Sequence, residues 1–491
     1  MKNKIYKNLE ELLEQNRVLY NFGELCKIPH MSFKEKQMGD YLLNWAKDRG
    51  LEATQDYKWN VFIKKPATAG YELAPVVMLQ AHMDMVCEKA PGVIHDFETD
   101  PIHLELNGDI LSTGGQTTLG ADDGIGVAYA MTILEADDIP HPPLEVLFTT
   151  AEEEDLSGAQ EVDASGFKAR MLINIDNAVE HELLAGSCGG MGVELTFSSD
   201  LCNAPNSFEG YRVSISGLPG GHSGEDINKG HGNANSLIGR LLYSYRKIFP
   251  FYLQELVGGS FRLALPREAN AILLISPEKV QELRQITNNM EHAFKREYEI
   301  VAPEFTIKLE KVMITDRKAA SPAAVKRLLA ALFLSPDGIS TMNNAVMGIV
   351  ESSDNMGEIR MENGKFIIVY EIRASFESTR EYIYQKIKTL AELLGGECHN
   401  FAEYPSWSFN PESKLRKLTS EIYHREFNDE INTMVVHCGL ECGCLFPKMP
   451  GLDAISIGPD AWGLHSPQER LSISSTERIF HLLKAVLADI H

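Results

Sequence analysis

Short apolar runs alternate with helical segments in the first part of the chain and again near its end. The early apolar runs are VVMLQ (76–80), PPLEVLFTT (142–150) and MLINID (171–176), and helical spacing marks DDGIGVAYAMTILEA (122–136). Near the end, residues 434–437 and 452–458 resemble strands, and residues 414–427 and 475–490 resemble helices. This alternation predicts an α/β fold in which helices cover both faces of a mostly parallel sheet.

The middle of the chain has a different pattern, in which a strand, a helix, further strands and a helix occur twice. Strands are expected at 211–217, 261–276, 305–312 and 345–375, and helices at 233–249, 277–298, 322–334 and 380–395. We interpret this as two βαββα units in tandem, which form a duplicated α+β domain. The predicted organisation is an α/β domain of residues 1–186 and 403–491, with the α+β domain inserted at residues 187–402.

The charge balance excludes some classes of partner. The chain has 46 Lys and Arg against 69 Asp and Glu, which gives a formal net charge of −23. Nucleic acids and anionic membranes bind basic surfaces, so neither is expected as a partner. The first 20 residues carry charges throughout, unlike a signal peptide, and no run approaches the roughly 20 apolar residues of a membrane span. We expect a cytoplasmic protein.

The eight cysteines are scattered, and we interpret them as reduced, mostly buried thiols. Three of them, Cys438, Cys442 and Cys444, form a C-x3-C-x-C cluster. A metal site is the alternative for this cluster, although a structural zinc site usually takes four ligands. His437 is the nearby candidate for a fourth ligand, and its position next to Cys438 is sterically awkward.

Histidines and acids follow several of the predicted strands. His82 and Asp84 come just after the first apolar run, and residues two apart in extended chain point the same way. His82 can therefore hold a metal while Asp84 orients its imidazole. Asp176 ends the run MLINID, and His465 lies in a loop after residues 452–458.

Two further acidic segments have a structural and a functional interpretation each. Asp122 and Asp123 lie in the glycine-rich turn LGADDGIG, where one Asp could cap a helix and a second could bridge metals. The run Glu152, Glu153 and Glu154 follows a predicted buried strand; it is either a solvated loop or part of a site. Mixed imidazole and carboxylate ligands suit zinc, cobalt or manganese, and a spare acid can act as a base.

The motifs, taken in order, resemble those of the zinc aminoacylase/carboxypeptidase superfamily of metallopeptidases. The shared set is H-x-D, L-G-A-D-D-G-I-G, E-E, I-D-N and G-x-H-S-P. Within that superfamily, GGHSGEDINKGHGNAN, LPREA, HCGLECG and ISIGPDAWGLHSP look like the aminoacyl-histidine (Xaa-His) dipeptidases, also called peptidase D. The resemblance runs from about residue 20 to the end. It implies a zinc-dependent hydrolase of dipeptides that have a free C-terminal carboxylate.

The resemblance also implies a role for each matching residue. Two Zn²⁺ ions, for which Co²⁺ or Mn²⁺ could substitute, would be held by His82, Asp122, Glu153, Asp176 and His465, with Asp122 as the bridge. The catalytic residues would be Glu152 as general base, Asp84 behind His82, and His222 of GGHSG for the oxyanion. Arg373, Gly439 and His222 would bind substrate from the inserted domain, which would act as a lid. The peptide bond between Asp122 and Asp123 is expected to be cis.

One position departs from the family pattern. Relatives carry an Asn in the strand before PREA, and this chain has Leu263, which either faces substrate or lies in the core. The alternative functions are a tripeptidase, an aminoacylase-type amide hydrolase, or a metal-binding scaffold without catalysis. The active site is expected to be complete in one chain, with a homodimer possible. The sequence leaves open the preferred dipeptide, the native metal and the oligomeric state.

Overall fold

The computed structural model describes residues 6–491, which form two compact units. The first runs up to Ser187 and also contains Trp407–Val435 and Leu440–His491. The second comprises Cys188–Ser406 and Val436–Gly439. The short segment 436–439 therefore groups with the inserted unit, whereas the sequence analysis placed it in the other domain. Among the described residues, no helix is long and apolar enough to cross a membrane.

The first unit is built on an eight-stranded mixed sheet, which confirms the α/β class. The strand order is β1 (Glu52–Gln55), β2 (Val61–Lys65), β6 (Leu144–Thr149), β3 (Val77–His82), β7 (Met171–Asn174), β21 (Asp453–Ser456), β8 (Glu182–Ser187) and β20 (Asn432–Val436). The four strands from β6 to β21 are parallel. Antiparallel pairs flank them, so the parallel part is limited to the centre.

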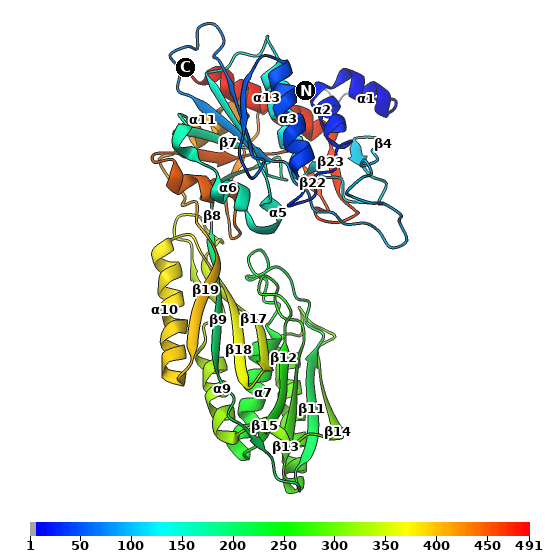
Figure 1. The fold of residues 1–491 in the computed structure, drawn as a ribbon, viewed down its shortest axis with the longest axis vertical. Coiled ribbons are helices and arrows are strands. Elements are labelled where there is room, and N and C mark those ends of the chain that lie inside the picture. Colours follow the sequence, from blue (N-terminus) through cyan, green and yellow to red (C-terminus); the bar gives the residue numbers. More distant parts are fainter. Residues whose placement is uncertain (1–5) are drawn as a thin grey trace. The chain divides into compact units, whose positions relative to one another are not determined.

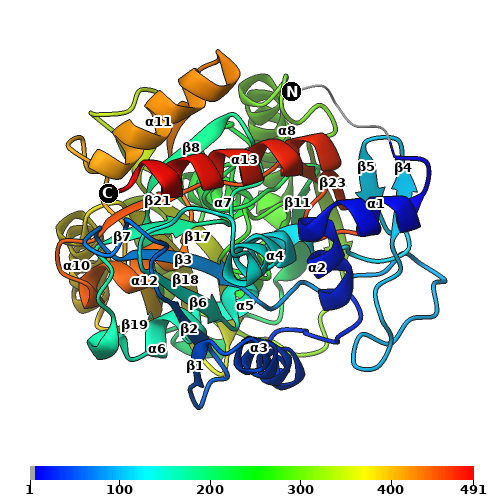
Figure 2. The same cartoon turned by 90° about the horizontal axis from the view of Figure 1, so that it is seen from above.

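The central strands are buried on both faces, which is why their sequences are continuous apolar runs and do not alternate. Helices cover the sheet, with α4 against β3, α3 against β2 and α11 against β21. Figure 2 shows α11 beside α13 and α2 close to α4. The helices of this unit are α1 (Leu9–Gln15), α2 (Arg17–Leu25), α3 (Lys36–Asp48), α4 (Ala121–Glu135), α5 (Glu152–Asp155), α6 (Ser157–Glu161), α11 (Lys414–Phe427), α12 (Glu441–Leu445) and α13 (Ile473–Asp489).

A small four-stranded sheet lies in the same unit. Its order is β22 (Ala461–Trp462), β23 (Arg470–Ser472), β5 (Ile110–Ser112) and β4 (Glu105–Asn107). Strands β22 and β23 pair antiparallel and form a hairpin whose tip is residues 463–469. This hairpin carries His465, and β23 connects it directly to α13.

The second unit contains an eleven-stranded sheet with its own apolar core. Its main strand order is β14 (Thr306–Val312), β11 (Glu209–Ser216), β13 (Ala269–Ile275), β12 (Tyr252–Gly258), β17 (Val350–Glu362), β18 (Lys365–Ala374), β9 (Gly189–Ser198) and β19 (Glu397–Tyr404). Three short strands of the sheet lie outside this main order: β10 (Leu201–Asn203), β15 (Lys318–Ala320) and β16 (Gly338–Met342). The helices are α7 (Ala234–Ile248), α8 (Val280–Glu297), α9 (Pro322–Leu334) and α10 (Glu377–Leu394). In Figure 1, α10 runs alongside β9 and β19.

The two halves of this sheet are nested, and the prediction of two tandem units was wrong in this respect. Strand β14 pairs with β11, so it completes the first half and does not begin the second. In the second half, β9 lies between β18 and β19. This is the place that corresponds to β11 in the first half. Since β9 precedes β11 in the chain, the whole first half is inserted after the first strand of the second.

The segment 261–276 contains one strand, whereas the sequence analysis expected two. Only β13 is extended, and it pairs with β12, which the sequence analysis did not identify. Residues 262–264 instead form a turn that the buried Asn355 side chain holds. Its amide donates to the carbonyls of Arg262 (2.7 Å) and Ala264 (2.9 Å). The turn is therefore fixed from β17, nearly a hundred residues further along the chain.

We predict that Asn355→Ala lowers the free energy of unfolding by about 1–3 kcal/mol, because two carbonyls lose their buried donor. Urea unfolding at equilibrium measures this. Asn400→Ala is the control, since Asn400 is exposed on β19 and its loss should change stability by less than about 0.5 kcal/mol. Equal stability of the two variants would contradict the importance of the Asn355 contacts.

Candidate metal centre

The predicted metal ligands of the first unit gather at one edge of its sheet. His82 ends β3, Asp176 follows β7, and Glu153 follows β6. These strands are parallel neighbours, so their carboxyl ends meet at the same edge, where open α/β sheets build their sites. Asp122 comes from the start of α4, and His465 from the tip of the β22–β23 hairpin.

The Asp122 carboxylate lies between the two histidines. Its Oδ1 is 3.0 Å from His82 Nε2, and its Oδ2 is 3.2 Å from His465 Nε2. Each imidazole also faces one further acid: Asp176 Oδ1 is 3.6 Å from His82 Nε2, and Glu153 Oε2 is 3.0 Å from His465 Nε2. Two sets of ligand atoms thus share one carboxylate.

The donor atoms fit a pair of cations. His82, Asp122 and Asp176 form one group whose ligand atoms all lie within 4.8 Å of each other, and Asp122, Glu153 and His465 form a second. A third group joins His82 to Glu152 and Glu153. The Glu153 Oε1 atom is buried and has no hydrogen-bond partner among the described residues, as expected for a ligand atom. Mixed nitrogen and oxygen donors suit zinc and similar divalent metals.

The electrostatics of the cluster also favour a cation. Burial raises the pKa of Glu153 to about 7, and the charge of Asp122 adds to the effect. Burial likewise raises the pKa of Asp176 to about 6. Burial would raise the pKa of Asp122 too, but hydrogen bonds with His465 and His82 outweigh it and lower that pKa. Several carboxylates in one desolvated space repel each other, and a bound cation relieves that repulsion.

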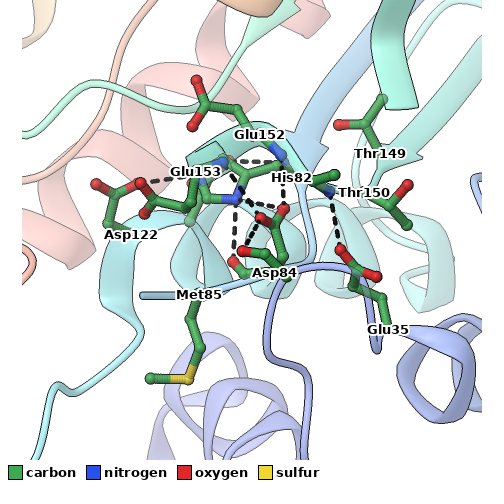
Figure 3. A network of polar contacts seen from close by, with 12 residues as sticks. Glu35, His82, Asp84, Met85, Asp122, Thr149, Thr150, Glu152 and Glu153 are labelled. Atoms are coloured by element: carbon green, nitrogen blue, oxygen red, sulfur yellow. Dashed lines mark hydrogen bonds and ion pairs between the residues drawn. The ribbon is translucent and has the colours of Figure 1, made fainter. Parts of the chain in front are cut away.

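Asp84 supports both His82 and the segment that contains Glu152 and Glu153, here called the glutamate turn. The His82 Nδ1 atom is 3.0 Å from the Asp84 carbonyl oxygen and 3.4 Å from its Oδ1. The Asp84 carboxylate accepts from the backbone N–H groups of Glu152 (3.1 Å) and Glu153 (3.2 Å). Figure 3 shows the Asp84 oxygens directed at these amides, while the Glu152 carboxylate points away from Asp84. One buried acid therefore orients a candidate ligand and the candidate base.

Glu35 is a second buried acid at this turn, and the sequence analysis missed it. Its Oε1 accepts from the backbone N–H of Ala151 (2.9 Å), the residue just before Glu152 (Figure 3). It also accepts from the N–H of Phe33. No sequence signal links Glu35 to residue 151, because more than a hundred residues separate them.

The two acids of the A-D-D turn have different surroundings. Asp122 faces the histidines, whereas the buried Asp123 accepts from the N–H groups of His82 (3.2 Å) and Gly126 (3.2 Å). Asp123 therefore acts in part as a helix cap, which is the structural role that the sequence analysis considered for one Asp of this turn. The peptide bond between the two is cis, as the sequence analysis expected.

The structure also separates the three consecutive glutamates. The Glu153 side chain is 6% exposed, while Glu154 is an exposed residue. Burial raises the pKa of Glu152, and the negative charges of Asp176, Glu153 and Glu441 raise it further. Exposure therefore sets Glu154 apart from the two glutamates that were assigned site roles.

Glu441 is a third acid that the sequence analysis did not single out. It is fully buried, and burial raises its pKa to about 8. Its Oε2 accepts from Thr149 Oγ1 (2.6 Å) at the end of β6 and from Gln80 Nε2 (2.5 Å) in β3. Glu441 therefore contacts both of the strands that lead to His82 and to the glutamate turn.

The predicted substrate residues His222 and Arg373 come together within the second unit. Arg373 is only 2% exposed, and Nη2 of its guanidinium donates to His222 Nε2 at 3.2 Å. Its Nη1 donates to the hydroxyl of Tyr404 (2.7 Å), and Ser223 Oγ accepts from its Nε and Nη2. Tyr404 and Ser223 were not predicted, and they complete a polar cluster around Arg373.

The remaining predicted residues lie in or near the segment that follows β20. Gly439 is half-buried and belongs to the second unit, as does Cys438. Cys442 and Cys444 are buried, and burial raises the pKa of both thiols. His437 contacts Ser353 Oγ through its Nε2 (2.7 Å). Between residues 6 and 491, the groups able to hold a metal include none of these cysteines.

Leu263 lies in the turn held by Asn355, not in a strand, and it is only half-buried. Its carbonyl accepts from the backbone N–H of Ser223 at 2.8 Å, and the next residue, Ala264, forms a β-bridge with His222. The expected strand position was therefore wrong, and the alternative of a core leucine does not hold either. The structure instead places Leu263 beside the segment that carries His222.

The fold and the cluster of acids and histidines are those expected of a metallopeptidase, and the comparisons agree. The model of peptidase family M20/M25/M40 matches residues 78–489. The chain therefore belongs to this family, and the prediction of a peptide-bond hydrolase is confirmed.

Three known proteins match the chain over nearly all of its length. The chain is 35% identical to the cytosol non-specific dipeptidase of Escherichia coli K12 over 469 residues, 96% of each chain. The crystal structure of the aminoacylhistidine dipeptidase of Vibrio alginolyticus matches with a TM-score of 0.87 and 34% identity, covering 97% of each chain. The aminopeptidase PepT of Bacillus cereus shares the fold, with a TM-score of 0.59 and 15% identity over 97% of this chain and 98% of that one.

Leu263→Asn tests whether this turn contacts substrate. We expect the variant to lower KM for a good dipeptide about fivefold to tenfold with little change in kcat, since one added hydrogen bond contributes about 1 kcal/mol. The melting temperature should stay unchanged, because Leu263 is half-buried in a turn. An unaltered KM in a fully stable variant would show that residue 263 does not face substrate.

Proposed function

We propose that this protein is a cytoplasmic two-metal dipeptidase that hydrolyses dipeptides with a free C-terminal carboxylate. The position of the Asp122 carboxylate between His82 and His465 carries the proposal, because one acid shared by two ligand sets is what a pair of metal ions requires. His82 and Asp176 would complete one set, and Glu153 and His465 the other. Zn²⁺ is the proposed metal, and Co²⁺ or Mn²⁺ are possible substitutes.

The bound metals would polarise the scissile carbonyl and make a water molecule acidic. Glu152 is the proposed general base. It follows β6 in the glutamate turn, and burial together with neighbouring acids raises its pKa, which suits a group that accepts a proton and then returns it to the leaving amine. Asp84 and Glu35 hold the backbone on both sides of Glu152 and so fix its position.

The cluster around Arg373 is the proposed binding site for the substrate carboxylate. A guanidinium and a carboxylate form charge-assisted hydrogen bonds, and a group that binds the terminal carboxylate would make the enzyme an exopeptidase. His222, hydrogen-bonded to Arg373, would stabilise the oxyanion. Gly439 would offer backbone groups to the same end of the substrate.

The substrate preference is proposed from the relatives. One is named a non-specific dipeptidase and another an aminoacylhistidine dipeptidase, so Xaa-His dipeptides such as β-alanyl-histidine and other dipeptides are the proposed substrates. Activity on a panel of dipeptides that includes β-alanyl-histidine, compared with tripeptides and N-acyl amino acids, tests this preference. Cleavage of tripeptides or N-acyl amino acids in place of dipeptides would contradict it.

The roles of Glu152 and Asp122 can be separated by metal analysis. We expect Glu152→Gln to retain both metals and to lose about 10²–10⁴-fold in kcat, because it removes the base but no ligand. Asp122→Ala should lose metal, because it removes the shared ligand. Glu152→Gln protein that purifies with one metal ion or none would show that Glu152 is a ligand.

We propose that His222 and Glu152 of the same chain serve one active site, and a mixing experiment tests this. Each of His222→Ala and Glu152→Gln should be nearly inactive alone, and a mixture of the two should recover no activity after subunit exchange. Mixing each variant with itself is the control. Substantial recovery in the mixture would show that His222 acts on a partner chain in a homodimer.

A further inference from the structure

Glu469 has unusual surroundings for a glutamate near a metal centre. It is 2% exposed and lies where the β22–β23 hairpin returns to β23, four residues after His465. Its carboxylate is in none of the groups that could hold a metal ion among residues 6–491. Instead it faces the turn of residues 119–122, nearly 350 residues earlier in the chain.

The carboxylate accepts from four successive backbone N–H groups of that turn. Oε2 accepts from Leu119 (2.6 Å) and Gly120 (3.0 Å), and Oε1 accepts from Ala121 (2.8 Å) and Asp122 (3.4 Å). These amides precede the regular part of α4, so they have no partner within the helix. Glu469 supplies the acceptor for all four.

The hairpin tip is itself tightly built. Ser466 Oγ donates to the Gly463 carbonyl (2.6 Å), and the Glu469 N–H donates to the Ser466 carbonyl (3.0 Å). Gly463 has φ +68°, and a Cβ there would lie 2.7 Å from the Gln468 carbonyl oxygen. The tip therefore has a fixed shape, and a contact made by Glu469 constrains His465 as well.

We infer that Glu469 is a positioning residue that fixes Asp122 relative to His465. It thereby sets the affinity of the metal position formed by Asp122, Glu153 and His465. Asp122 and His465 come from distant parts of the chain, and their side chains meet at 3.2 Å. The His465 side chain is 51% exposed, so packing contributes little to holding it. One buried carboxylate, joined to the Asp122 turn on one side and to the His465 tip on the other, provides the link. The inference rests on the proposed two-metal function.

Glu469→Gln is the test, because an amide keeps the size but can accept on one side only, so two of the four N–H groups lose their acceptor. We expect the variant to bind the more weakly held of two Co²⁺ ions about 10–100-fold less tightly, the range found when residues that orient metal ligands are changed. The visible absorption of the Co²⁺ protein should change with it. In the metal-free protein, hydrogen exchange of the 119–122 amides should be at least tenfold faster.

Glu145→Gln is the matched control. Glu145 is also 2% exposed, and its carboxylate also accepts backbone N–H groups, from Lys168 and Ala169, at a turn away from the metal ligands. It should lose thermal stability without a change in Co²⁺ affinity, in the spectrum, or in exchange at residues 119–122. If Glu469→Gln does not fold, Glu469→Asp takes its place, since a shorter side chain withdraws the carboxylate from the turn.

The outcomes are separable. Wild-type protein that binds two Co²⁺ ions, with Glu469→Gln equal to it in affinity, spectrum and amide exchange, overturns the role of Glu469 alone. Wild-type protein that binds fewer than two ions overturns the proposed function and this inference with it. Weaker Co²⁺ binding in Glu469→Gln but not in Glu145→Gln supports the role.

Discussion

Buried carboxylates at the edge of the first sheet repel each other, and the chain must hold them together against that repulsion. Asp122, Glu153 and Asp176 would separate if they were held loosely, because like charges in a desolvated space repel. The chain fixes them from behind with further acids that accept backbone N–H groups. Asp84 and Glu35 hold the glutamate turn, and Glu469 holds the Asp122 turn. Two of the three segments that carry these acids are therefore fixed by contacts within the protein.

The candidate ligands could be predicted from sequence because their signal is local. Each follows an apolar strand or lies in a glycine-rich turn, and parallel strands bring their carboxyl ends to one edge. Glu35, Glu441 and Glu469 carry no such signal, since a buried acid and a solvated acid look the same in sequence. Their partners are backbone amides far along the chain, and only the folded structure shows those contacts.

The same reasoning explains what was predicted of the fold. Strands and helices were identified from their periodicity, and α9 and α11 begin and end at the predicted residues. The pairing of strands was not identified, because periodicity does not show which strand lies next to which. This is why β14 was assigned to the wrong half, and why the role of β9 became clear only from its pairing with β18 and β19.

The nesting of the two halves has a consequence for how the chain folds during synthesis. Strand β9 (Gly189–Ser198) is made early, but its partners β18 and β19 lie at residues 365–374 and 397–404. The complete first half is made between them and can form its own sheet while β9 waits with both edges unpaired. Unpaired edges are open to pairing with other chains. Both edges of β9 stay open in this way until residues 365–374 have emerged from the ribosome.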